Sequence, residues 1–372
     1  MPGGYSAAID ESAVKDAAHL SAHASARDVE TALGRDSRDI WDLAALLSPV
    51  AGAEYLESIA ERSRELTRQR FGKTIHLFAP LYVSNACVST CTYCGFSKSN
   101  EIARTTLEPD EVRVEAGYLL DQGFRHILLV SGEHARIVSP DYLCEVIDAL
   151  APSVPQISLE VQTWSATEYE RFVAAGADGI VVYQETYDRQ RYSEVHLRGR
   201  KRDYDARLDA LDHAASAGAR RLGAGALLGL LPDWRADVIS LAEHALWLTR
   251  KHWRCEISVA LPRLRPCIGS EAEVSPVGDR DYLQAICALR LLLPDAAIVL
   301  TTREPARLRD GLMQVGVTHM SAGSHTEPGG YTLGHLGADP QFDVDDRRPV
   351  SEVANAIAEN GYDPVWKDWA RV

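Results

Sequence analysis

The segment "TIHLFAPLYVSNACVSTCTYCGFS", residues 74–97, joins a short apolar run to three closely spaced cysteines. The apolar run is typical of a buried β-strand. Cys87, Cys91 and Cys94 follow it with the spacing C-x3-C-x2-C, among polar neighbours such as Asn85 and Thr92. Three thiols in such surroundings are poorly explained as parts of a hydrophobic core. The segment raises two questions: which fold this strand begins, and what the thiols bind.

Similar apolar runs recur along the chain and answer the first question. Helical patterns, for example residues 108–124 and 139–150, lie between most of them. Eight strand candidates in a strand–helix rhythm indicate a parallel sheet, and eight strands close a barrel. We therefore predict an α/β fold, a (βα)8 TIM-type barrel, with a doubly wound open sheet as the alternative. The eight runs are "TIHLFAP", "HILLVS", "ISLEVQ", "GIVVYQ", "RLGAGALLG", "EISVAL", "AIVLTT" and "VTHM".

The two ends of the chain read differently from the barrel region. The N-terminal part is polar, and "AEYLESIAERSRELTRQRFG" places apolar residues at helical spacing before it ends at Gly72. We predict a helical extension over residues 1–72 and a barrel domain over residues 73–372. The last segment of that domain, "DVDDRRPVSEVANAIAENGYDPVWKDW", predicts a C-terminal helix with a packed end.

Composition excludes several classes of partner. The formal net charge is −14, from 39 Lys and Arg against 53 Asp and Glu, which argues against nucleic acid and anionic membrane surfaces. The N-terminus carries acids where a signal peptide needs basic residues, and no apolar run approaches the ~20 residues of a membrane span. We expect a cytoplasmic protein whose seven cysteines stay reduced.

Polar residues stand where the predicted strands end. In a barrel the chemistry lies at the C-terminal ends of the strands, so these residues are expected to converge on a site. Each one alone fits an ordinary surface loop, but the set does not. Glu160 and Gln162 alternate on one strand and are expected to face the same way, without an assigned role. The strand-end residues are Asn85, Cys87, Ser131, Gly132, Glu133, Glu160, Gln162, Gln184, Glu185, Arg263, Arg265 and Arg303.

The three cysteines favour an iron–sulfur cluster. Three thiolates can hold three irons of a [4Fe–4S] cubane and leave the fourth iron open. A structural zinc site needs a fourth ligand nearby, and no His or Cys lies between Gly95 and Arg125. A disulfide fits the reducing compartment less well. The remaining cysteines, Cys144, Cys255, Cys267 and Cys287, are widely spaced, and we expect structural roles for them.

The C-x3-C-x2-C spacing after the first barrel strand, with Tyr93 before the last cysteine, resembles the signature of the radical S-adenosylmethionine (SAM) enzymes. Further segments are similar to the aromatic-amino-acid lyase branch, and most of all to the tyrosine lyases of thiazole (thiamine) biosynthesis, the 2-iminoacetate synthase family. The similarity runs from about Lys73 to the C-terminus. Its segments are "APLYVSNACVSTCTYCGFS", "LLVSGEH", "VYQETY", "GALLGL", "PRLRPC", "TTREP", "PGGY", "DDRRP" and "PVWKDW".

The resemblance implies an activity. Cys87, Cys91 and Cys94 would bind one [4Fe–4S] cluster, and SAM would ligate its open iron and yield a 5′-deoxyadenosyl radical. The radical would take a hydrogen from the amine of L-tyrosine, and the Cα–Cβ bond would break. The products would be 2-iminoacetate (dehydroglycine) and p-cresol. Thiazole synthase would receive the iminoacetate, and a flavodoxin or ferredoxin would supply electrons.

The resemblance also implies the residues that contact SAM. Tyr93 would lie with its backbone near the adenine. An acid suits the SAM amino group, and a carboxylate can accept hydrogen bonds from both ribose hydroxyls. The matching residues are Ser131, Gly132 and Glu133 for the amino group, Gln184 and Glu185 for the ribose, and Arg207 for the carboxylate.

Three further residues match the substrate-binding positions of the family. Arg303 would grip the carboxylate of the amino acid, because a planar guanidinium makes two parallel hydrogen bonds to it. Ser321 would assist through its hydroxyl, and Tyr82 would lie beside the substrate amine. The alternatives are a structural salt bridge for Arg303 and plain packing or capping for Ser321 and Tyr82.

Three other functions stay open at this point. The maturase of [FeFe] hydrogenase also cleaves tyrosine but carries a second cluster on C-terminal cysteines, and this chain has no cysteine after Cys287. The tryptophan lyases share the carboxylate-binding arginine but differ around "CTYCGF" and "SGEH". A non-catalytic metal-binding protein would not need the charged strand ends.

Overall fold

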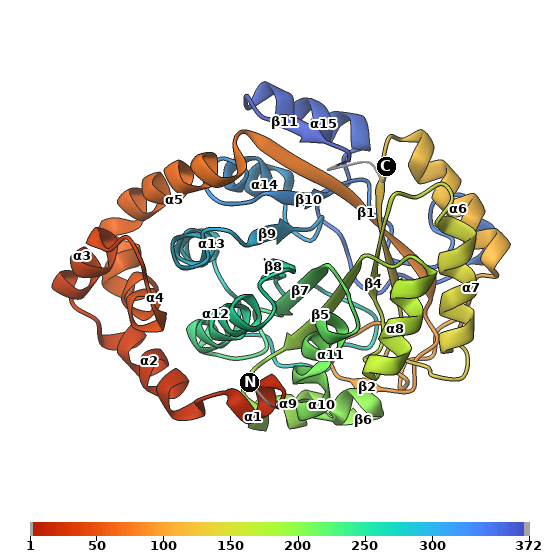
Figure 1. Cartoon of the computed structure of the whole chain (residues 1–372), viewed down its shortest axis with the longest axis horizontal. Coiled ribbons are helices and arrows are strands. Elements are labelled where there is room, and N and C mark those ends of the chain that lie inside the picture. Colours follow the sequence, from red (N-terminus) through yellow and green to blue (C-terminus); the bar gives the residue numbers. More distant parts are fainter. Residues whose placement is uncertain (1–2, 368–372) are drawn as a thin grey trace.

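The computed structural model describes residues 3–367, and its centre is a closed parallel barrel (Figure 1). The last strand pairs with the first, His76 opposite His319, which closes the sheet and rules out the open alternative. All eight predicted runs contribute a strand. In order around the barrel these are β1 (Thr74–Ser84), β3 (His126–Ser131), β4 (Gln156–Glu160), β5 (Gly179–Glu185), β7 (Arg221–Ala226), β8 (Glu256–Ala260), β9 (Ala297–Leu300) and β10 (His319–Ser321).

Helices cover the outside of the barrel and bury one continuous apolar core. Both example helices are present, because each has a proline at its start and an apolar face that packs on the sheet. The helices that follow the barrel strands are α6 (Pro109–Asp121), α7 (Pro140–Leu150), α8 (Ala166–Ala175), α9 (Arg189–Val195), α10 (Tyr204–Leu208), α11 (Ala210–Ser216), α12 (Trp234–Lys251), α13 (Asp279–Leu292), α14 (Ala306–Leu312) and α15 (Val350–Glu359).

The N-terminal helices wrap one side of the barrel in an arc (Figure 1). Helix α2 packs on α12, α5 packs on α13, and their buried residues join the same core as the barrel strands. The N-terminal extension therefore packs against the barrel domain and shares its core. The boundary between the two at residue 72 stays a prediction. The helices of the extension are α1 (Tyr5–Ala8), α2 (Glu11–His23), α3 (Ala26–Gly34), α4 (Ile40–Leu46) and α5 (Leu56–Phe71), with a π-helical turn at Ala51–Tyr55.

Three short strands add to the predicted ones. β2 (Thr90–Cys91) lies in the cysteine loop and pairs antiparallel with β6 (His196–Arg198). β11 (Asp363–Val365) follows α15 and pairs with the start of β1, so the C-terminal helix has a packed end, as predicted. The end of the "PVWKDW" segment lies outside the described residues.

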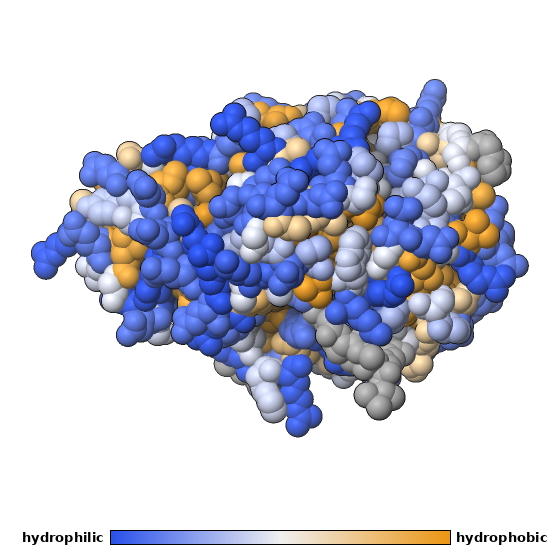
Figure 2. Space-filling view, turned by 90° about the horizontal axis from the view of Figure 1, so that it is seen from above, coloured by the Kyte–Doolittle hydropathy of each residue, from blue (hydrophilic) through white to orange (hydrophobic). Residues whose placement is uncertain are grey.

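The surface is mainly polar, with apolar residues interspersed. The face seen in Figure 2 is mostly hydrophilic, and its apolar residues lie in small scattered groups. Within residues 3–367, no helix is long and apolar enough to cross a membrane.

Candidate active site

A cavity opens at the C-terminal ends of the barrel strands. Its volume is about 1280 Å³, open solvent included. Every strand-end or loop residue predicted for cluster, SAM or substrate lines it, except Gln184. The side-chain amide of Gln184 instead donates to the carbonyl of Tyr204, which does not line the cavity. The residues that the structure brings together are Tyr82, Cys87, Cys91, Tyr93, Cys94, Ser131, Gly132, Glu133, Glu185, Arg207, Arg303 and Ser321.

The cysteine loop is held from several sides. Its first turn is tied to the loop after β3 by the amide of Val88, which donates to the carbonyl of Glu133 at 2.8 Å. At its far end, the amide of Gly95 donates to the carbonyl of Gln341 at 3.1 Å. A Cβ on Gly95 would stand 2.5 Å from that oxygen, so only glycine allows this close approach. The loop therefore presents its thiols from a fixed backbone.

Two of the three thiols are buried deeply enough to favour their protonated form. Burial, followed by the charge of Glu133, raises the pKa of Cys87 to about 11, and burial raises the pKa of Cys91 well above its ordinary value. A metal bound by these two thiols would therefore have to displace their protons. Within the described part of the chain, no three His, Cys, Asp or Glu side chains converge as around one ion.

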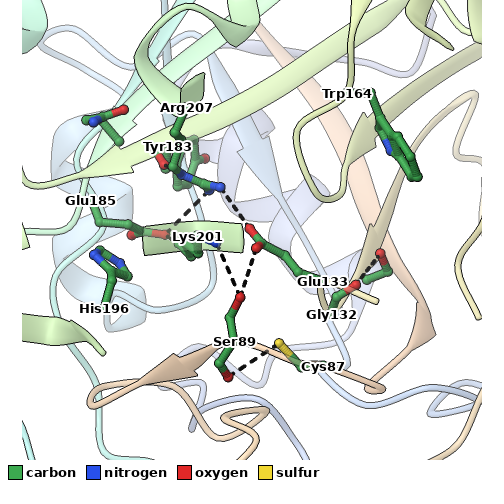
Figure 3. Close-up of polar contacts among 12 residues, drawn as sticks. Cys87, Ser89, Gly132, Glu133, Trp164, Tyr183, Glu185, His196, Lys201 and Arg207 are labelled. Carbon is green, nitrogen blue, oxygen red and sulfur yellow. Dashed lines mark hydrogen bonds and ion pairs between the residues drawn. The ribbon is translucent and has the colours of Figure 1, made fainter. Parts of the chain in front are cut away.

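A polar network lies beside Cys87 (Figure 3). The guanidinium of Arg207 donates to Glu133 at 2.9 Å and, through Nε, to the carbonyl of Tyr183 at 2.7 Å. The hydroxyl of Ser89 donates to the other oxygen of Glu133 at 3.1 Å. Glu133 and Arg207 are both buried. The carboxylate is therefore oriented by two donors next to Cys87.

A second carboxylate, Glu185, is held in a strained backbone. It is the one non-glycine residue with positive φ, 73°, among the described residues. Lys201 Nζ donates to it at 2.6 Å (Figure 3). Burial alone would raise the pKa of Glu185, but the charges of Lys201 and Arg207 lower it below its ordinary value. Strain of this kind persists where the surroundings enforce it, often at a functional site.

Tyr93 is fixed by a buried histidine. His196 Nδ1 lies 2.9 Å from the carbonyl of Tyr192, and only a protonated nitrogen can donate there. Burial lowers the pKa of His196 to about 3, so the ring is neutral and Nε2 is an acceptor. The hydroxyl of Tyr93 then donates to Nε2 at 2.7 Å. This bond holds the Tyr93 ring and its backbone beside the cavity.

The loop after β3 approaches the cysteine loop very closely. A Cβ on Gly132 would collide with the carbonyl oxygen of Ala86, so glycine is required there. The hydroxyl of Ser131 donates to the carbonyl of Gly132 at 3.0 Å. Both residues border the space next to Cys87.

Three residues line the part of the cavity expected to bind substrate. Arg303 makes no salt bridge within the described residues, and its guanidinium lies 3.4 Å from the centroid of the Phe342 ring. The structural salt bridge considered for Arg303 is therefore absent from this part of the chain. Tyr82 donates its hydroxyl to Gln341 at 2.8 Å. The hydroxyl of Ser321 accepts from the amide of Thr302 at 3.1 Å, so it shapes the Arg303 loop.

Several strand-end residues do not join the site. Gln162 and Glu160 do not face the same way, because β4 ends at Glu160: Glu160 lines the cavity, whereas the Gln162 amide donates to the carbonyl of Val138. The expectation of alternation was wrong there. Arg263 pairs with Glu304 and Asp279. The other two are also occupied elsewhere: Arg265 pairs with Asp345, and Asn85 bonds the backbone of Ala103 and Thr105.

Several lining residues were missed by the sequence prediction, and four of them contact or surround the predicted ones. Ser89 sits inside the cysteine motif, where its partner could not be foreseen. Lys201 belongs to the basic run "RGRKR", which usually marks a solvated surface. The other two, Gln341 and Phe342, come from a C-terminal loop without a pattern. That loop is anchored by the buried ion pair between Arg309 and Asp346, part of "DDRRP".

Comparison with known proteins shows that the chain is a radical SAM enzyme. The model of the radical SAM superfamily matches residues 81–244, and the model of the biotin and thiamin synthesis associated domain matches residues 260–363. The chain belongs, more narrowly, to the 2-iminoacetate synthase family. It is 44% identical to 2-iminoacetate synthase of Escherichia coli (strain K12) over 344 residues, which cover 92% of this chain and 91% of the relative.

A second relative supports the family, and a solved structure supports the fold. 2-Iminoacetate synthase of Salmonella typhimurium (strain LT2) is 43% identical over the same share of both chains. The crystal structure of HydG, a maturase of the [FeFe]-hydrogenase, superposes with a TM-score of 0.89 at 30% identity and covers 96% of this chain and 80% of that one. The barrel fold and the enzyme class predicted from the sequence are confirmed.

Proposed function

We propose that the protein cleaves the Cα–Cβ bond of L-tyrosine to 2-iminoacetate and p-cresol, with 5′-deoxyadenosine and methionine formed from SAM. The observation that carries this proposal is the unpaired guanidinium of Arg303 inside the cavity that also holds Cys87, Cys91 and Cys94. Within the described residues this guanidinium makes no ion pair, and such a cation fits the carboxylate of an amino acid.

The residues present fit one [4Fe–4S] cluster and one molecule of SAM. Cys87, Cys91 and Cys94 would hold the cluster, and the charged groups around Glu133 and Arg207 would hold the methionyl part of SAM. When bound, the cluster and SAM supply one-electron hydrogen abstraction. Glu185 would accept hydrogen bonds from the ribose.

The chain's own residues place the substrate. Arg303 holds the carboxylate through two parallel hydrogen bonds, which fixes the Cα and its amine. Tyr82, fastened by its bond to Gln341, forms the wall beside the amine. A fixed amine is what hydrogen abstraction requires, because the reacting atoms must be in near contact. The buried cavity also keeps water from the imine product.

The proposal also covers the protein partners and the cellular compartment. A flavodoxin or ferredoxin would supply electrons, thiazole synthase would take the iminoacetate, and the reaction would run in the cytoplasm. Support for these partners comes from the family resemblance alone.

The proposed activity is tested by an anaerobic assay with SAM, a reductant and L-tyrosine. We expect 5′-deoxyadenosine, methionine and p-cresol, and glyoxylate from hydrolysis of released 2-iminoacetate. Deoxyadenosine without p-cresol from tyrosine, together with an indole product from tryptophan, would instead support the tryptophan lyase activity.

A further inference from the structure

Glu160 is a carboxyl group without a partner inside the cavity. It is the last residue of β4, and its side chain lines the cavity. Glu160 is half-buried, and within residues 3–367 its side chain makes no hydrogen bond and no salt bridge. Burial, with the charge of Glu185 next, raises its pKa to about 7. The group is therefore available to a ligand.

Glu160 and Arg303 lie on opposite sides of the barrel. Around the closed sheet, three strands separate β4 from β9 in either direction: β5, β7 and β8 on one path, and β3, β1 and β10 on the other. Arg303 follows β9, and it also lines the cavity. One unpaired cation and one unpaired carboxyl thus stand across a shared space.

The wall between these two groups is largely aromatic and apolar. Tyr82, Tyr183, Leu128 and Phe78 line the cavity there. The charge of Glu160 contributes to the raised pKa of both Tyr82 and Tyr183, after burial, so the carboxyl is near both rings. A flat aromatic ring fits such a wall.

We propose that Glu160 accepts a hydrogen bond from the phenol hydroxyl of the substrate and so makes the site select tyrosine over phenylalanine; this rests on the proposed function. Tyrosine has a carboxylate at one end and one hydroxyl donor at the other. With the carboxylate on Arg303, the amine is only one carbon away, and the phenol is the group that can extend to the opposite strand. Phenylalanine would leave the half-buried Glu160 unpaired inside the cavity, and a site with such an unpaired polar group rejects the analogue strongly.

A rival role for the same residue is a salt bridge to the substrate ammonium. Both amino acids carry the same ammonium group. Removal of the carboxyl would then weaken tyrosine and phenylalanine equally. The ratio of the two affinities therefore separates the roles.

The test is equilibrium binding of L-tyrosine and L-phenylalanine to the reconstituted protein with SAM and without reductant, by calorimetry. We expect the unmodified protein to prefer tyrosine by about ten- to a hundredfold, as for a hydrogen bond to a charged group. Glu160→Leu should bring the two affinities within about threefold, mainly by loss of tyrosine binding. Glu160→Gln keeps a weaker acceptor and should give an intermediate ratio. Glu243→Gln, the same change at a half-buried carboxyl on α12, should keep the original ratio.

Iron content and SAM affinity of each variant report that the site is intact. If Glu160→Leu fails to load iron, the test rests on Glu160→Gln, which changes the fewest atoms. Its ratio of tyrosine to phenylalanine affinity then decides. An unchanged ratio in Glu160→Gln and Glu160→Leu, or equal weakening of both ligands, overturns the proposal. Absence of p-cresol from the unmodified protein would overturn the proposed function, and that result is independent of the binding ratio.

Discussion

The guanidinium of Arg207 donates to the carboxylate of Glu133 at 2.9 Å, and both side chains are buried at the mouth of the barrel. A second donor, Ser89, fixes the other oxygen of Glu133. Two groups from different segments, the loop after β3 and helix α10, are thereby joined beside Cys87.

Loss of one member of this pair should be costly. In Arg207→Leu, Glu133 stays buried without its cation, and we expect the free energy of unfolding to fall by about 3–5 kcal/mol. Arg207→Leu with Glu133→Gln should recover part of the stability but not the binding of SAM. Urea denaturation and SAM binding by calorimetry measure the two effects. Arg113→Leu, which breaks an exposed pair with Asp110, should cost at most about 1 kcal/mol. Equal losses in the two arginine variants would contradict the assignment.

The assignment of one cluster to three cysteines predicts how many iron atoms each chain binds. Replacement of Cys87, Cys91 or Cys94 by Ala should abolish SAM cleavage and lower iron content. Cys144→Ala and Cys287→Ala are matched controls, because these thiols lie in helices outside the cavity, and iron content should be unchanged. Iron analysis of reconstituted protein should give about four irons per chain. About eight irons would contradict a single cluster.

Arg303→Lys keeps the charge but loses the two parallel hydrogen bonds to the substrate carboxylate. We expect tyrosine binding to weaken by about 2–5 kcal/mol, seen as a raised KM, while SAM binding persists. A change at the nearby Arg309 would not be a matched control. Its guanidinium forms a buried ion pair with Asp346, so its loss would disturb the fold itself. Turnover of tyrosine with an unchanged KM would show that Arg303 does not hold the carboxylate.

Asp237 makes stability depend on pH. Burial raises its pKa to about 7, and its Oδ2 atom has no partner within the described chain. The folded-state pKa is above the unfolded value near 4, so this group's contribution is fully present below pH 4 and is lost as pH rises to about 7.

Asp237→Asn removes this titration while its amide oxygen can still accept from Thr186 and Tyr187. Relative to the unmodified protein, the variant should gain about 2–3 kcal/mol of unfolding free energy between pH 5 and pH 8. Urea denaturation at both pH values measures this, with the exposed Asp110→Asn as control. The same difference at pH 5 and pH 8 would contradict the burial argument.

The barrel could be predicted because its strands are buried on both faces and appear in the sequence as apolar runs. β3, for example, coincides with "HILLVS". The cysteine loop could be predicted because its residues are adjacent in sequence. Lys201 could not, since a basic run gives no sign that one of its members turns inward to Glu185.

Strand ends set another limit to sequence prediction. The alternation of side chains holds only while a strand continues, and β4 stops at Glu160. Gln162 therefore turns away, although the sequence alone gives no reason to end the strand there. Gln341 was equally hidden, because it reaches Tyr82 across 259 residues of sequence from an irregular loop.

The central claim, cleavage of tyrosine between Cα and Cβ, is tested most directly with L-tyrosine carrying ¹³C at Cα. Under anaerobic conditions with SAM and reductant, the protein is incubated with this substrate, and the fate of the label is followed by mass spectrometry. We predict ¹³C in glyoxylate and unlabelled p-cresol. Label in an aromatic product, or in cyanide or carbon monoxide, would contradict the account.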